Sequence, residues 1–294
     1  MHFRYRYYLE RIYKPIKPIF GDWMGKMGIC IITFFLVIAI CAPIIAPQGP
    51  FKMYRTDDGK MAKLKPPSSE HWFGTTRSTM DVLSQTVWGT RVALLVGIIS
   101  AFCCTFIGTN VGIISGYYGG RIDDVLMRIT DIAYGIPFLP LCMLLVAFLE
   151  PSIWNTLFSI VILFWRTTAR VIRSQVLSLK ERPFVWSAKA SGASDFRIMY
   201  LHIAPNVLPL SLLYMALAVG WGVMVEASLS FLGFGDPLTM SWGLMLNNAF
   251  HAAAMRTAWW WIVPPGVSIA LVVVSFFLVG RAYEEYVNPR LRNM

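Results

Sequence analysis

The chain has 294 residues, of which 56% are apolar and only 14% charged, and its formal net charge at pH 7 is +10. A soluble domain carries about a quarter charged residues, so this composition excludes an ordinary soluble enzyme as well as a disordered or fibrous chain. The charged residues are absent from long stretches and crowded into a few others, which indicates an all-α polytopic membrane protein.

The N-terminal segment, residues 1–26, is basic and aromatic, and we expect residues 3–20 to lie along the inner lipid headgroups. The first apolar stretch begins only near Met27 and ends in small residues followed by Pro47, which is a poor site for signal cleavage. We therefore predict an uncleaved first transmembrane helix over 27–46. A long external segment, 47–90, follows it.

A bilayer core of about 30 Å requires roughly 20 apolar residues in a helix. The chain is predicted to have six transmembrane helices, at 27–46, 92–115, 131–149, 153–169, 207–232 and 259–280. The last five would form a core over 91–281, and residues 282–294 would form a tail.

Lys and Arg residues set the predicted orientation. If the N-terminus is inside, most of the 26 basic residues fall in cytoplasmic segments, many of them in the 166–204 loop. The external segment 47–90 is also basic, but segments of this length carry less weight. We therefore predict a multi-pass cell-membrane protein with both termini cytoplasmic, whose positive charge faces anionic lipid rather than nucleic acid.

Glycines recur every four residues along the second predicted helix, at Gly108, Gly112 and Gly116. This spacing places them on one face, where a second helix backbone can approach closely. We predict that they pack helices together.

The sequence contains no recognisable catalytic or metal-binding motif. Its four histidines are scattered, its five cysteines lack C-x-x-C spacing, and no Gly-x-Ser-x-Gly occurs. The Gly21–Met27 stretch lacks the spacing and the Ser or Thr of a phosphate-binding loop. We therefore predict a non-catalytic chain that itself binds no cofactor and no metal.

One ionisable residue, Glu226, lies inside an apolar span. A carboxylate there suggests a water-filled path or proton coupling, or else a structural carboxylate or a gate-packing residue. We favour the structural or gate-packing interpretation, because no second acidic residue accompanies it. Ser228 and Ser230 join it as pathway or gate candidates.

The 170–206 segment has the features of a projecting helical loop. Val171–Leu179 continues the fourth span as a helix that ends before Pro183, and Gly192 permits a sharp turn. Ser194 or Asp195 would cap a second helix. Such a projection could seat in a groove of a partner protein, and the alternative is a solvated loop.

This loop resembles the Glu-Ala-Ala motif of ATP-binding-cassette importer permeases, with Ala188, Gly192, Ile203 and Pro205 at matching positions. The chain is most similar to the second permease of the dipeptide, oligopeptide and nickel group, and the resemblance covers roughly residues 25–290. Other stretches that match in order are Ala42–Pro47, His71–Thr75, Asp81–Ser84, Gly116–Gly120, Asp123, Arg128, Asp131, Glu226–Gly233 and Ser241–Gly243.

The chain also departs from the pattern of that group. Trp186 stands where the motif has Glu, Ser187 where it has the first Ala, and Thr79–Met80 where Gly-Arg is usual. The loss of the acidic residue argues against a charge pair at the docking surface.

The resemblance implies a type I importer (MetI-like) permease fold and a heteromeric assembly. Its expected partners are a second homologous permease, two ATPase subunits that hold ATP and Mg, an extracytoplasmic substrate-binding protein and membrane lipid. The residues expected to form the ATPase-coupling loop are Trp186, Ser187, Ala188, Gly192, Asp195, Ile203 and Pro205.

The sequence leaves the substrate undecided, and it leaves one alternative functional class to be considered. Peptides are the first expectation, and oligosaccharides or nickel chelates are the alternatives. An ion-coupled secondary transporter or channel would carry paired intramembrane charges and an internal repeat, which we do not find. A membrane-embedded enzyme would need a catalytic constellation.

Overall fold

The computed structural model describes residues 20–46, 48–54 and 63–287 and is mostly helical, with no β-strand beyond two isolated bridges in that part of the chain. The helices are α2 (Trp23–Ile45), α3 (Val82–Tyr118), α4 (Gly120–Gly135), α5 (Phe138–Leu149), α6 (Ile153–Leu179), α7 (Pro183–Ala190), α8 (Asp195–Arg197), the π-helical turn η1 (Ile198–Ile203), α9 (Ala204–Phe231), α10 (Trp242–His251) and α11 (Trp259–Val287). The predicted headgroup segment 3–20 falls almost wholly outside the described residues.

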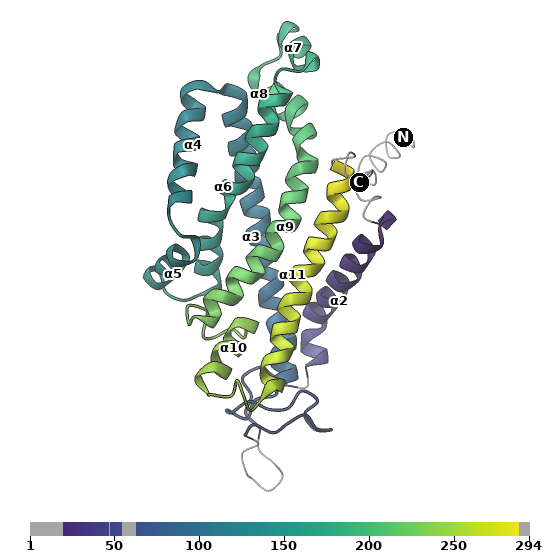
Figure 1. Ribbon diagram of the computed structural model, residues 1–294, viewed down its shortest axis with the longest axis vertical. Helices are drawn as coiled ribbons and strands as arrows, with labels where there is room; N and C mark the ends of the chain where they lie inside the picture. The colour runs from purple at the N-terminus through teal and green to yellow at the C-terminus, as the bar shows by residue number, and fades with distance from the viewer. Residues whose placement is uncertain (1–19, 47, 55–62, 288–294) are drawn as a thin grey trace.

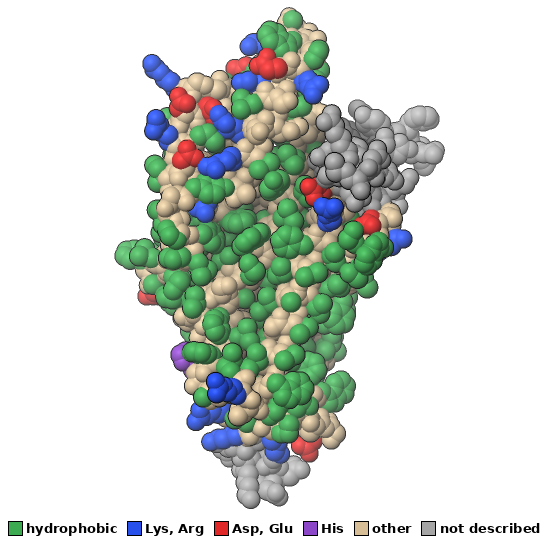
Figure 2. Space-filling view, in the orientation of Figure 1, with side chains coloured by type: hydrophobic (Ala, Val, Ile, Leu, Met, Phe, Trp, Pro, Cys, Tyr) green, Lys and Arg blue, Asp and Glu red, His purple; other side chains and the backbone are tan. Residues whose placement is uncertain are grey.

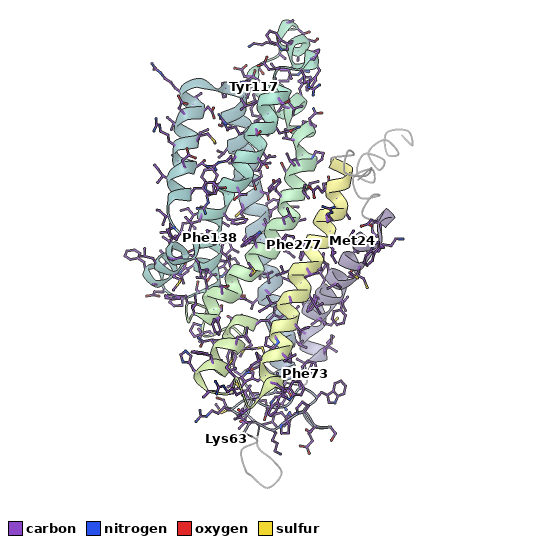
Figure 3. The ribbon with its side chains drawn as sticks, viewed as in Figure 1. Met24, Lys63, Phe73, Tyr117, Phe138 and Phe277 are labelled. Carbon is purple, nitrogen blue, oxygen red and sulfur yellow. The ribbon has the colours of Figure 1, made fainter. Side chains whose placement is uncertain are left out.

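The long helices run along one axis of the molecule, and α3 packs against α6, α9 and α2 (Figure 1). Helices α7 and α8 project at one end, whereas α10 and the segment before α3 lie at the other. Figure 3 marks these ends with Tyr117 near the projection and with Lys63 and Phe73 at the opposite end.

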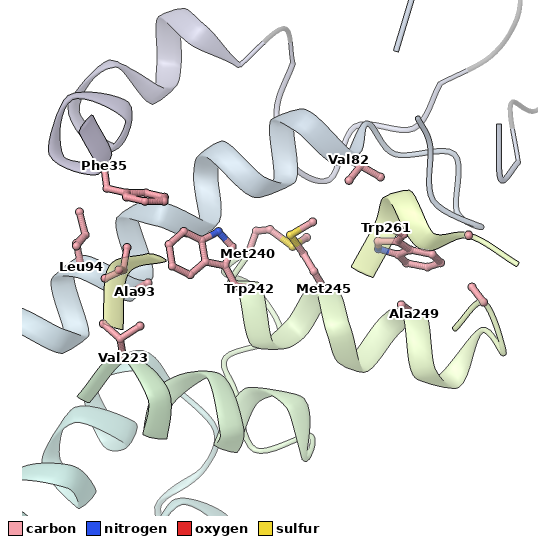
Figure 4. Close-up of a cluster of buried hydrophobic side chains, with 13 residues drawn as sticks. Phe35, Val82, Ala93, Leu94, Val223, Met240, Trp242, Met245, Ala249 and Trp261 are labelled. Atoms are coloured by element: carbon pink, nitrogen blue, oxygen red, sulfur yellow. The ribbon is translucent and has the colours of Figure 1, made fainter. Parts of the chain in front are cut away.

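The largest buried cluster lies where α2, α3, α10 and α11 meet (Figure 4). Trp242 at its centre is fully buried, and its indole nitrogen donates to the Thr86 carbonyl oxygen at 2.9 Å. The ring of Phe35 from α2 packs edge-on against Trp242, with centroids 5.8 Å apart. This contact anchors the N-terminal helix to the rest of the bundle.

Helix α3 begins well before the predicted position 92, inside the segment expected to be external. Asp81 caps it, because a side-chain oxygen of Asp81 accepts from the Ser84 backbone N–H at 2.7 Å. The sequence pattern missed this first part because it is more polar than the remainder of the helix.

By length and apolar composition, four described helices can cross a membrane, namely α2, α3, the continuous Asp195–Phe231 helix and α11. The predicted third span, 131–149, is instead broken between α4 and α5, which meet at 90° and count as a fifth span only together. Ile136 precedes Pro137 and takes an extended conformation, as residues before proline do.

The fourth predicted span lies in the 27-residue helix α6, which contains Arg166, Arg170 and Arg173 and is not among those apolar helices. The count of six spans is therefore not confirmed.

On the face shown in Figure 2, apolar side chains form a broad band across the middle of the molecule, and charged side chains gather towards both ends. On α2 the exposed apolar residues include Phe34, Val37, Ile40 and Ile44. A band of this kind is suited to contact lipid tails.

Candidate functional site

The projecting loop begins where α6 ends at Leu179. Helix α7 starts with Pro183 in its first turn, where the missing N–H costs nothing. After α7 the backbone at Gly192 has φ +78°, and its N–H donates to the Lys189 carbonyl oxygen at 3.0 Å. Glycine adopts this left-handed conformation without strain, so Gly192 reverses the chain.

Ser194, not Asp195, caps the second helix, because the Ser194 hydroxyl accepts from the Arg197 N–H at 3.4 Å. The Asp195 carboxylate instead accepts a hydrogen bond of 2.6 Å from the Tyr117 hydroxyl on α3. Pro205 lies exposed in the first turn of α9, which the π-helical turn η1 joins to α8.

Buried apolar residues attach the projection to the bundle. Ile203, Ile198 and Val185 pack in one cluster with Ile113 of α3 and Ile172 of α6. The outer face is different, because Trp186 is 61% exposed and Phe196 is 69% exposed. The projection is thus fixed at its base and carries exposed aromatic side chains on its outer face.

Beside α7 lies a hollow of about 390 Å³ with mixed polar and aromatic walls. Its lining residues are Tyr117, Tyr118, Lys180, Glu181, Val185, Trp186, Lys189 and Asp195. Of the predicted coupling residues, the structure places Trp186 and Asp195 on this hollow. Ser187 and Ala188 lie elsewhere on α7, where Ser187 supplies a carbonyl oxygen to the Ser191 hydroxyl at 2.8 Å.

An ion pair stabilises the base of the projection. Arg173 on α6 donates from Nε to Asp123 Oδ1 on α4 at 2.5 Å, its Nη2 reaches Oδ2, and the Ser115 hydroxyl donates to the same carboxylate. By accepting the two hydrogen bonds from Arg173, the Asp123 carboxylate raises the pKa of the Arg173 guanidinium above its usual value. The pair therefore stays ionised at neutral pH and joins three helices.

The predicted glycine row lies against α6. A Cβ added at Gly108 would come within 2.5 Å of the Trp165 carbonyl oxygen, and one at Gly112 within 2.7 Å of the Ala169 carbonyl oxygen. At Gly116 it would meet Val176 Cβ at 2.8 Å. Only residues without a side chain permit two backbones to approach this closely.

At the opposite end of the molecule, Glu226 is only 3% exposed. The Ser230 hydroxyl donates to Glu226 Oε1 at 2.7 Å, so the structure brings these two candidates together. Ser228 donates to the Met224 carbonyl oxygen at 2.7 Å and takes no part in that contact.

Sequence reasoning missed several polar contacts. The Arg173–Asp123 and Tyr117–Asp195 contacts join residues far apart in the chain, and no local spacing identifies such pairs. Within the described residues, no group of three or more His, Cys, Asp or Glu side chains could hold a metal ion.

Comparison with known families adds a strong match. Residues 108–293 match the family described as the binding-protein-dependent transport system inner membrane component. The chain is 33% identical to the dipeptide transport system permease protein DppC of Bacillus subtilis (strain 168), over 92% of this chain and 82% of that protein. It is 35% identical to the DppC protein of Alkalihalophilus pseudofirmus, over 95% and 90% of the two chains.

The oligopeptide transport system permease protein OppC of Bacillus subtilis is 33% identical, over 96% of this chain and 93% of that protein. Among solved structures, a chain of the inward-facing MetNI methionine ABC transporter has a TM-score of 0.54 and 18% identity. That match covers 70% of this chain and 95% of the transporter chain, and it supports the fold alone.

Proposed function

The chain belongs to the family of binding-protein-dependent transport system inner membrane components, and we propose that it is the permease subunit of an ATP-driven importer of peptides. It is a multi-pass membrane protein of that family. The observation that carries the proposal is the helical projection α7–η1, whose base is buried in the bundle and whose outer face carries exposed aromatic side chains.

The proposed assembly contains a second homologous permease, two ATPase subunits that bind ATP and Mg, and an extracytoplasmic binding protein. The projection would face the cytoplasm and seat in an ATPase groove. The start of α2 and the end of α11 point towards the same end of the molecule (Figure 1), which supports cytoplasmic termini. In this arrangement α6 and the broken α4–α5 pair complete six spans.

The buried base provides a route for coupling. Closure of the ATPase pair on ATP would move α7, and the Ile203 and Val185 contacts would pass that motion to α3, α6 and α9. The pathway would then alternate between inward- and outward-open states. ATP shifts that equilibrium only in so far as the ATPases bind it more tightly in one state.

Peptides are the proposed substrate because the relatives of similar length are named as dipeptide and oligopeptide permeases. Oligosaccharides and nickel chelates are the alternative substrates. The external binding protein is proposed to choose among these substrates.

Two measurements test this proposal. The tagged full-length chain, purified from its native membrane, is expected to copurify with a second permease and an ATPase pair, and uptake of labelled dipeptide is expected to need ATPase activity. A chain that purifies alone and drives uptake after the ATPases are inactivated would instead be an ion-coupled secondary transporter. Uptake of nickel chelates or oligosaccharides but not peptides would overturn only the substrate.

A further inference from the structure

A small polar cavity lies at the end of the molecule opposite α7. Its volume is about 10 Å³, enough for roughly one water-sized sphere. Its lining residues come from α3, α6, α9 and the loop to α10, and they are Val92, Val96, Ile153, Thr156, Glu226, Ser230, Asp236, Thr239 and Ser241. The cavity therefore joins four parts of the chain.

Glu226 is the most deeply buried charged group on this cavity. Its Oε1 accepts the hydrogen bond from Ser230, and Ser241 also interacts with the carboxyl group. Its Oε2 is buried and has no hydrogen bond of ordinary geometry. A buried carboxylate oxygen without a partner is costly, so this atom requires a positive or proton-donating neighbour.

The other carboxylate on the cavity is already satisfied. Asp236 Oδ1 accepts from the Leu238 N–H at 2.8 Å, and Oδ2 accepts from the Thr239 hydroxyl at 3.2 Å. Asp236 is also partly exposed, whereas Glu226 is not. None of the lining residues is Lys, Arg or His, so the cavity offers the buried Glu226 carboxyl group no basic partner.

We propose that this cavity binds one small monovalent inorganic cation, with Glu226 Oε2 as its charged ligand. Carboxylate and hydroxyl oxygens are the ligands that hard cations prefer, and Thr156 and Ser241 supply hydroxyls on the same walls. A single positive charge would balance the one negative charge of an ionised Glu226. The bound cation would tie α9 to α6 and to Ser241, whose hydroxyl caps α10 by accepting from the Leu244 N–H at 3.2 Å.

A wider hollow adjoins the cavity. This hollow has a volume of about 430 Å³ and shares Val92, Ile153 and Thr239 with the cavity. The walls of this hollow are mostly apolar, and Arg91 is the one basic residue among those that line it.

The test uses the full-length chain in detergent. We measure thermal unfolding at constant ionic strength in NaCl, KCl or choline chloride, since choline is too large for the cavity. A ligand that binds only the folded state raises the melting temperature. We therefore expect a higher melting temperature in at least one of the two inorganic salts than in choline chloride.

Variants then show whether Glu226 is responsible for the rise in melting temperature. Glu226→Gln keeps the shape but removes the charge, and it is expected to abolish the rise, whereas Glu70→Gln, at an exposed carboxylate in another part of the chain, should retain it. Thr156→Val should reduce the rise in melting temperature. Equal melting temperatures of the wild-type chain in all three salts would overturn the proposal in favour of a water or a proton, even if Glu226→Gln fails to fold. A rise that persists in Glu226→Gln would overturn it as well.

Discussion

Glycine has opposite roles in two regions of this chain. In the seam between α3 and α6, Gly108, Gly112 and Gly116 leave out a side chain so that two backbones can pack. In the projection, a Cβ at Gly192 would meet nothing within 4 Å, but the backbone there has φ +78°. The seam uses the small size of glycine, whereas the projection uses its conformational freedom.

This difference separates residues that hold the fold from residues that are proposed to meet a partner. The seam is buried, and its polar neighbours Asp123 and Arg173 bond to each other. The projection exposes Trp186 and Phe196, which find no cover within the described chain. We therefore expect changes in the seam to affect stability, and changes in the projection to affect coupling.

The largest loss of stability is expected for Gly112→Val. The new Cβ would lie 2.7 Å from the Ala169 carbonyl oxygen and 2.9 Å from the Arg173 backbone nitrogen, and backbone atoms cannot move aside as a flexible side chain can. Overpacking of this kind costs about 3 kcal/mol or more. Thermal unfolding of the purified chain should show a much lower melting temperature and a poor yield of folded protein.

Gly266→Ala is the matched control, because a Cβ at Gly266 in α11 meets nothing within 4 Å. We expect a stability equal to that of the wild type or slightly greater, since alanine favours a helix by about 1 kcal/mol over glycine. If Gly112→Val were as stable as Gly266→Ala, the close packing of α3 on α6 would be wrong.

The second largest loss is expected for Asp123→Ala. It leaves the Arg173 guanidinium and the Ser115 hydroxyl without their shared acceptor at the junction of α3, α4 and α6. Because Arg173 is 30% exposed, water can replace part of the interaction, and we expect a loss of about 2 kcal/mol. Chemical denaturation in detergent measures it.

Asp131→Asn serves as the comparison for that variant. Asp131 pairs with Arg170 at 2.7 Å, but the two side chains are 64% and 49% exposed. Exposed pairs contribute little, so we expect almost no change. Equal losses in the two variants would show that burial does not distinguish these ion pairs.

The sequence predicted the helical membrane class and the helix packing at the spaced glycines, because both depend on composition and local periodicity. It also predicted that the helix would run to Leu179 before Pro183, since proline restricts the residues next to it. The start of α3 at Val82 was missed, and the third predicted span, which proline interrupts at Pro137, is broken at 90° rather than kinked within one continuous helix. Both lie where polarity or a bend departs from the regular apolar pattern.

The cavity that Glu226 lines was predictable in part. Glu226 stood out as a charge inside an apolar span, but the neighbours Thr156 and Asp236 come from other parts of the chain and meet it only through the fold. The Tyr117–Asp195 contact is also long-range. Long-range pairs of this kind cannot be read from one sequence.

A smaller loss of stability, with a large loss of function, is expected for Gly192→Val. A β-branched residue at positive φ costs about 1–2 kcal/mol, and the turn after α7 would open to relieve it. Peptide uptake should then fall strongly while membrane insertion and overall unfolding change little. Gly192→Asn is the control, because asparagine tolerates this conformation and should retain uptake. Unchanged uptake in the valine variant would mean that the turn does not transmit motion.

The smallest effect is expected for Tyr117→Phe, which removes one exposed hydrogen bond of 2.6 Å between α3 and Asp195. The melting temperature should hardly change, because such a bond contributes under about 1 kcal/mol. Hydrogen exchange of the α7 and α8 backbone should nevertheless speed up, since this bond ties the tip of the projection to the bundle. Tyr118→Phe removes a hydroxyl from the same hollow but leaves the bond to Asp195 intact, so it should keep the wild-type exchange rates. Equal hydrogen-exchange rates in the two variants would mean that the buried base alone orients the projection. The projection would then depend on buried packing, as the seam between α3 and α6 does.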